Sequence, residues 1–196
     1  FSYATIMHFF LGWGFFELLF ATSVDFATAR GFFLEYLPGM DEPWFAFLND
    51  TGGLLLFIGL VMALYRRMMD RPELLPHSNL TQRGNLFGDT GILCFLLLLV
   101  FGGYLAEAAR IAVDQPVDAR YSWIGYPLSN VLSLSTWITI KPVLWWFHAI
   151  TSLLFIALLP TTKMMHSIAV ILNIVFTNRS RRGEVRTMHV SKILED

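Results

Sequence analysis

Cysteine is almost missing from this chain: among 196 residues only Cys94 is a cysteine, and it lies within an apolar run. One cysteine excludes a disulfide framework, a thiolate metal site and an iron–sulfur motif within these residues. The net charge of −1 gives none of the basic excess of a nucleic-acid-binding domain. Residues 1–20 lack a basic n-region, so no cleavable signal peptide is evident. No repeat with a period of 20–50 residues is present, which excludes a solenoid.

Apolar residues, in contrast, are abundant and gather into four segments. Hydrophobic residues make up 55% of the chain, and its mean hydropathy of +0.55 is far from that of a soluble domain. The segments run from about 3 to 26, 54 to 69, 86 to 113 and 138 to 176, with an aromatic lead-in at 44–47. The sequence therefore predicts an all-α fold, a helical transmembrane bundle of four main spans, with room for a further span before residue 1.

The fourth segment is too long for one straight crossing of about 20 residues, and Pro160 interrupts it. We expect the crossing to end near Met165 and residues 169–176 to lie at the interface as an amphipathic extension. This divides the chain into a transmembrane domain over 1–177 and a polar tail over 178–196.

Basic residues are unequally shared between the two sides of this bundle. One side of the bundle holds the start of the first segment, the loop between the second and third segments, and the tail. This side carries nine basic residues: Arg66, Arg67, Arg71, Arg83, Arg179, Arg181, Arg182, Arg186 and Lys192. The other side carries Arg30, Arg110, Arg120 and Lys141. The positive-inside rule puts the first side in the cytoplasm, which predicts an inner-membrane protein with a cytoplasmic C-terminal tail. The tail could bind anionic membrane lipid or an acidic partner, although a solvated tail explains its charges equally well.

Three histidines lie in or beside these apolar segments. His148 and His166 are 18 residues apart, which on one helix would place them on the same face, roughly 27 Å apart. That separation suits one ligand near each face of a hydrocarbon core about 30 Å thick. Ionisable groups in a membrane are costly and usually functional, and neutral imidazole is the commonest metal ligand. The pattern indicates either a b-type haem protein or histidines that only pack helices together.

His8 opens the first segment on the predicted cytoplasmic side, where His166 closes the fourth. Two imidazoles from antiparallel helices could then ligate one haem iron from opposite sides, as in low-spin electron-transfer haems. Gly12 follows His8 by four residues and shares its face, where a missing side chain would let a flat macrocycle approach. Close helix packing is the alternative role for Gly12 and for the neighbouring Gly14.

Glu107 and Arg110 are polar residues near the outer end of the third segment. Their spacing of three allows a mutual ion pair on a helix. The functional alternative is a quinone site, with Glu107 as a proton carrier and Arg110 holding a haem propionate or a quinone carbonyl, because quinone chemistry needs a titratable group at its pocket. Asp25, Asp50 and Asp89 are further carboxylates at the membrane edge without clear partners.

Four stretches within about Ile6 to Phe176 carry a family resemblance, and a fifth lies beyond them in the tail. They are the His8 helix with Gly12 and "WGFF", then "ALYRRMMDRP", "GGYLAEAARIA" and "WWFHAITSLLFIALLPTTKMMH", and in the tail "GEVRTMHVSKILED". The chain resembles the cytochrome b (gamma) subunit of respiratory nitrate reductase. It is most similar to the membrane part of fused proteins that join such a cytochrome to a heterodisulfide-reductase-like iron–sulfur domain, as in some electron-transfer-flavoprotein:menaquinone oxidoreductases.

The resemblance implies two b haems stacked across the membrane. It matches His8 and His166 to the ligands of the cytoplasmic haem and His148 to one ligand of the outer haem. The position of the other outer ligand is Leu18, which cannot bind iron, so the outer haem could be absent, held by His148 alone or completed by another group such as Glu17. The tail would lead to an iron–sulfur domain. His77 and His189 fit ordinary solvated roles.

Three cations on the cytoplasmic side are candidates to neutralise haem propionates. Lys163 lies three residues before His166, on roughly the same helix face. Arg66 and Arg67 end the second segment on that side. Snorkelling of these side chains to the interface is the alternative.

Together these features predict an oxidoreductase subunit or domain, a membrane cytochrome b with one haem b expected and a second allowed. It would pass electrons between a cytoplasmic iron–sulfur or flavoprotein partner and membrane menaquinone. The iron–sulfur cluster would belong to the partner or to a further C-terminal domain. The alternative is a haem-free membrane anchor or assembly subunit of a redox complex. A proton-relay transporter is disfavoured, because the spans are few and no inverted repeat is present.

Overall fold

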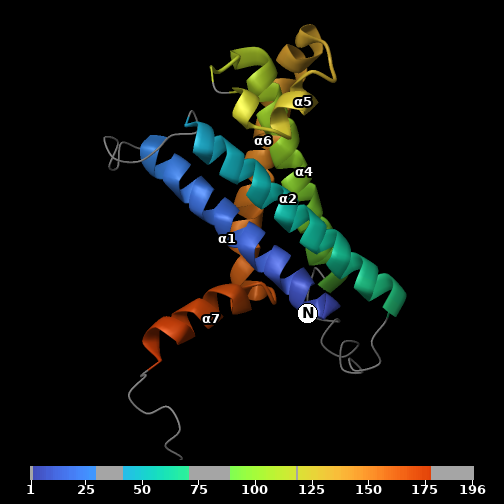
Figure 1. Ribbon diagram of the computed structural model, residues 1–196, viewed down its shortest axis with the longest axis vertical. Helices are drawn as coiled ribbons and strands as arrows, with labels where there is room; N and C mark the ends of the chain where they lie inside the picture. Colours follow the sequence, from blue (N-terminus) through green and yellow to red (C-terminus); the bar gives the residue numbers. More distant parts are fainter. Residues whose placement is uncertain (1, 30–41, 71–88, 118, 178–196) are drawn as a thin grey trace, which may run out of the picture. The chain divides into compact units, whose positions relative to one another are not determined.

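The computed structural model describes residues 2–29, 42–70, 89–117 and 119–177. It divides into two units, residues 1–163 and residues 164–196, which are considered separately. Figure 1 shows the first unit as long helices accompanied by a few short elements. The described residues include no β-strand, which confirms the predicted all-α fold.

Four helices of the first unit are long and apolar enough to cross a membrane. They are α1 (Tyr3–Ala29), α2 (Pro43–Tyr65), α4 (Asp89–Asp114) and α6 (Leu134–Leu158). Large apolar side chains such as Phe9, Trp13 and Trp146 are exposed on their outer faces, which suits contact with lipid. The four predicted spans are therefore present.

The starts of two helices follow from local sequence. Pro43 occupies the first turn of α2, where its missing N–H leaves no hydrogen bond unmade. Ser133 caps α6, since its hydroxyl accepts a hydrogen bond from the Thr136 amide at 3.3 Å. The second span was predicted to begin at residue 54; because α2 begins at Pro43, the aromatic lead-in is part of the helix. At its other end α2 continues as a π-helix, Arg66–Asp70.

Between α4 and α6 the chain forms elements that the hydrophobic pattern does not predict. Gln115 has a positive φ of 47° and reverses the chain after α4. A 3-10 turn, η2 (Ala119–Tyr121), and the short helix α5 (Gly125–Ser129) follow. Both pack back on the long helices, η2 against α2 and α5 against α4. This segment carries several polar groups of the candidate site.

The fourth apolar segment is two helices. α6 ends at Leu158, a 3-10 turn (η3, Leu159–Thr161) contains Pro160, and α7 (Met165–Phe176) lies in the second unit. The predicted break at Pro160 is confirmed, but the membrane-length stretch ends at Thr161 and not near Met165. The assumption that one helix carries both His148 and His166 is therefore wrong, because proline disrupts the ladder. The meeting of His8 with His166 stays a prediction.

Glycines bring α1 and α2 together, as Figure 1 shows by their course side by side. A Cβ added to Gly14 would clash with the backbone of Gly52 and Leu56, and one added to Gly59 would lie 2.8 Å from the Leu11 amide. Small residues of this kind let membrane helices approach closely. Phe15 of α1 also meets Phe155 of α6 edge-on, with ring centroids 6.1 Å apart.

Candidate functional site

His8 lies near the start of α1 with its side chain exposed. Its Nδ1 is 2.7 Å from the backbone oxygen of Ala4. A carbonyl oxygen can only accept, so in the neutral ring Nδ1 carries the hydrogen and Nε2 keeps the free lone pair. Metal-binding histidines are usually oriented by such a bond from the other ring nitrogen. The exposed His8 ring therefore keeps Nε2 as its free acceptor, the atom through which the predicted iron ligation would occur.

Gly12 lies one turn after His8, and the space beside it is open. Among the described residues, a Cβ built there would meet no atom of a neighbouring element within 4 Å, whereas one at Gly14 would strike α2. The two glycines, which the sequence could not tell apart, thus differ in role. Gly14 serves helix packing, and Gly12 leaves a flat strip of α1 beside the His8 ring, on which a planar group could lie.

His148 is half-buried in α6 and lies against two glycines of α4. A Cβ added to Gly103 would be 3.1 Å from its Cε1, so a side chain there would push the ring away. Its Nδ1 is buried and makes no hydrogen bond within the described residues, although the Leu99 carbonyl lies near the ring. A buried polar atom without a partner costs free energy, so this imidazole is a second candidate ligand.

Leu18 of α1 occupies the position where the second ligand of the outer haem was expected. Leu18 is half-buried and offers no donor atom. Its neighbour Glu17 faces α2, since a Cβ on Gly52 would lie 3.0 Å from the Glu17 Cδ. Glu17 is thus engaged with the α1–α2 interface, which argues against its service to His148 on α6.

A cluster of polar groups forms where α2, α4 and the α4–α6 connection meet. Asp50 of α2 is 0% exposed, and its Oδ2 accepts hydrogen bonds from the amides of Ile124 at 2.6 Å and Gly125 at 3.2 Å. Glu107 of α4 accepts a hydrogen bond from the Ser122 hydroxyl at 2.9 Å, and its side chain interacts with that of Asp50. We call Asp50, Glu107 and Ser122 the carboxyl cluster. The Tyr104 hydroxyl donates to the Asp50 carbonyl oxygen at 2.7 Å beside it.

Arg110 does not form the ion pair with Glu107 that its spacing allows, as far as the described residues go. It acts on Glu107 only through its charge, while Glu107 turns to Ser122 and Asp50. The ion pair at this end joins Lys141 of α6 to Asp114 of α4 at 2.5 Å. The sequence identified Glu107 but missed Asp50 and Ser122 as its neighbours, because their proximity depends on how α2 packs on α4 and on the course of the α4–α6 connection. Tyr104 lies one turn before Glu107 on α4, where spacing alone could have placed it.

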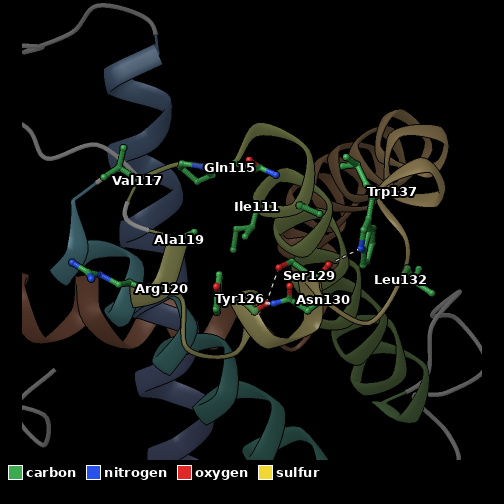
Figure 2. Close-up of a pocket in the computed structure, with 13 residues that line it drawn as sticks. Ile111, Gln115, Val117, Ala119, Arg120, Tyr126, Ser129, Asn130, Leu132 and Trp137 are labelled. Atoms are coloured by element: carbon green, nitrogen blue, oxygen red, sulfur yellow. Dashed lines mark hydrogen bonds between the residues drawn. The ribbon is translucent and has the colours of Figure 1, made fainter.

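A hollow of about 540 Å³ lies beside this cluster, at the ends of α4 and α6. Figure 2 shows Arg120, Tyr126 and Asn130 among its polar lining residues and Trp137 on its wall. The Trp137 indole donates to the Ser129 carbonyl at 2.8 Å and fixes α5 to α6. Neither Glu107 nor Arg110 lines the hollow, so the residues named from the sequence lie next to this space and not in its wall.

The remaining candidate residues are described one at a time. Arg66 and Arg67 are half-buried on the π-helical end of α2, and Lys163 is exposed at the end of the first unit. His166 is exposed on α7 in the second unit. The described residues contain no group of three or more His, Cys, Asp or Glu side chains that could hold a bare metal ion, whereas a haem iron needs only axial ligands.

Several predictions lie outside the described residues. They concern His77, His189, the linker 178–196 and the side chains of Asp25 and Asp89.

Two curated proteins are similar to this chain. It is 28% identical over 182 residues to the EtfAB:quinone oxidoreductase of Syntrophomonas wolfei subsp. wolfei. The matched region covers 87% of this chain and 24% of that relative. It is 25% identical over 151 residues to a subunit of the dihydromethanophenazine:CoB–CoM heterodisulfide reductase of Methanosarcina thermophila, covering 76% of this chain and 47% of that relative. The chain therefore spans about a quarter and just under half of these relatives.

No family model and no solved structure matches the chain. The two relatives agree with the predicted likeness to membrane proteins linked to heterodisulfide reductases. The likeness to the nitrate reductase gamma subunit is not confirmed by them and stays a prediction.

Proposed function

We propose that this chain is the membrane cytochrome b part of a quinone-linked electron-transfer protein. The observation that carries the proposal is the arrangement at His8, whose Nδ1 is held by the Ala4 carbonyl while Gly12 leaves an open face beside the ring. The second axial ligand predicted from the sequence is His166. A bound b-type haem would supply one-electron chemistry; the chain would supply ligands, orientation and an apolar surround.

The partners of this reaction are proposed from the relatives. One relative is named as an EtfAB:quinone oxidoreductase, and the other is named as a subunit of a heterodisulfide reductase. We therefore propose a cytoplasmic flavoprotein or iron–sulfur partner on one side and a membrane quinone, with menaquinone as the expected type, on the other. Arg66, Arg67 and Lys163 would interact with the anionic propionates on the cytoplasmic side. A haem-free anchor or assembly subunit stays the alternative.

For the outer side we propose His148 as the ligand of any second haem. Its buried Nδ1, which makes no hydrogen bond within the described residues, and its contact with Gly102 and Gly103 support this role. Leu18 supplies no second ligand, so an outer haem held by this chain would be high-spin or otherwise unusual. Arg110, close to Glu107, would hold a propionate or a quinone carbonyl.

The direct test of electron transfer is reoxidation by quinone. The purified protein is reduced chemically, a menaquinone analogue is added, and the b-type absorption bands are followed in time. We expect the quinone to reoxidise the protein, because both haem and quinone would lie in the same bundle. Bands that stay reduced with excess analogue would rule out the quinone link, and a protein without such bands would favour the anchor.

Replacement of Glu107 by Gln should slow this reoxidation by about 100-fold or more, the usual contribution of a positioned proton donor or acceptor. Gln keeps the size of the side chain and can still bond to Ser122, but it cannot exchange a proton. Lys141→Gln, which changes the exposed pair with Asp114, is the control and should react as wild type. Equal rates for the Glu107 variant and wild type would remove Glu107 from the reaction.

The proposed topology places the C-terminal tail, residues 178–196, in the cytoplasm, where it would lead to an iron–sulfur domain. In sealed right-side-out vesicles a tag at residue 196 should resist added protease, and it should be cleaved in inverted vesicles, because only the latter expose the cytoplasmic face. Cleavage in right-side-out vesicles alone would reverse the orientation.

A further inference from the structure

The carboxyl cluster contains one feature that the proposed electron transfer does not explain. Asp50 is 0% exposed, yet its two carboxyl oxygens differ in their partners. Oδ2 accepts two backbone hydrogen bonds, from Ile124 and Gly125, whereas Oδ1 is buried and has no partner within the described residues. A buried acceptor without a donor is unusual, because it loses its hydrogen bonds to water and regains none.

Glu107 is the group placed to supply the missing donor. Its carboxyl packs on Gly125, where an added Cβ would lie 2.9 Å from the Glu107 Cδ, and the Gly125 amide is bound by Asp50. Both carboxyl groups therefore adjoin the same glycine, and they interact directly. Glu107 Oε1 is occupied by the Ser122 hydroxyl, which leaves Oε2 free to carry a hydrogen.

Two ionised carboxylates are unfavourable side by side in such a place. Like charges at close range in a poorly solvated interior disfavour double ionisation, so one proton is retained by the pair. Ionised carboxylates only accept hydrogen bonds, whereas a protonated one also donates. A proton on Glu107 would make it a donor beside Asp50, whose Oδ1 has no partner within the described residues. The two amides at Oδ2 and the nearby Tyr104 and Arg110 complete the polar surroundings.

We propose that Asp50 and Glu107 hold a single shared proton at the outer end of the bundle, with Asp50 as the positioning residue that keeps Glu107 protonated. The use of this proton in quinone chemistry rests on the proposed function, but the shared proton itself does not. The pairing of the two carboxyl groups requires Gly125, since a side chain at this position would displace Glu107 from Asp50. Protonation of the pair requires no haem, so it can be measured in the apoprotein as well.

Infrared spectroscopy in H₂O and D₂O at pH 7 tests the proposal on the full chain in lipid. Exposed carboxyl groups, with pKa values near 4, are ionised there, so a C=O stretching band of a protonated carboxyl that shifts in D₂O marks a retained proton. We expect this band in wild type and its loss in Glu107→Gln. We also expect its loss in Asp50→Asn, because the new amide would donate to Glu107 and release the proton.

The controls separate this pair from the other buried carboxyl and from misfolding. Glu17→Gln should keep the band, since Glu17 lies against Gly52 on another interface. Circular dichroism checks that each variant is helical, and Glu107→Gln alone carries the test if Asp50→Asn does not fold. A wild type without the band, a band lost only in Glu17→Gln, or a band retained in folded Asp50→Asn would each overturn the proposal. A band that behaves as expected in a protein inert to quinone would leave the shared proton standing and refute only its proposed use.

Discussion

Replacement of His8 by Ala is expected to abolish the low-spin b-type signal of the purified protein. The His8 ring has its Nδ1 bound to the Ala4 carbonyl and its Nε2 free, so its loss would remove the proposed axial ligand together with the bond that orients it. His166→Ala should have the same effect if His166 is the second ligand. Optical spectra and electron paramagnetic resonance of the oxidised protein measure both losses.

Two other histidines provide matched controls for this experiment. His77→Ala, in the loop predicted to be solvated, should leave all bands unchanged, and His148→Ala should leave the inner low-spin signal in place while removing any outer haem. Unchanged spectra in both the His8 and His166 variants would refute the inner site. A conventional low-spin outer haem that depends on His148 would show that another residue supplies the second ligand, which Leu18 cannot supply.

Leucine at position 12 is expected to exclude haem from a protein that still folds, whereas leucine at position 14 should disturb the fold itself. A Cβ at Gly12 would meet no neighbouring element among the described residues, so we expect the added side chain to leave the bundle in place while it fills the strip next to His8. At Gly14 it would meet the backbone of Gly52 and Leu56, and overpacking of this kind costs on the order of 1–3 kcal/mol or more.

Haem content and thermal unfolding of the helical signal, measured side by side, distinguish the two glycine variants. We expect Gly12→Leu to lose haem with little change in the unfolding temperature of the apoprotein, and Gly14→Leu to unfold at a lower temperature. Gly12→Ala is the milder companion and should lose only part of the haem. Full haem content in Gly12→Leu would mean that haem does not lie on this strip.

The hydrophobic pattern predicted the four spans because long apolar runs in a membrane have few alternatives to helix. It misplaced the start of α2, since Asn49, Asp50 and Thr51 interrupt the apolar run although the helix passes through them. It also treated His148 and His166 as parts of one helix. The sequence shows that Pro160 interrupts the helix, but it does not show how many residues the interruption spans. The chain between α4 and α6 was left without structure, because five-residue helices have too few turns to show a period.

Within the candidate site, the sequence predicted residues that are unusual for their surroundings. Histidines and a glutamate within apolar runs are conspicuous, so His8, His148 and Glu107 could be named in advance. Asp50 was also noticed but had no partner in sequence, since its partners are backbone amides more than 70 residues away. Whether Gly12 or Gly14 packs against another helix depends on the crossing point of α1 and α2, which spacing alone does not determine.

Haem binding by this chain is measured by the pyridine haemochrome assay of the purified protein, with the protein determined by amino-acid analysis. We expect a b-type spectrum with at least about one haem per chain, since the proposed ligand His8 has its ring held by Ala4 and its Nε2 free. A stoichiometry near two would add the outer site at His148. Protein prepared with ample haem that is folded and still shows none would contradict haem binding and leave a haem-free membrane anchor as the function.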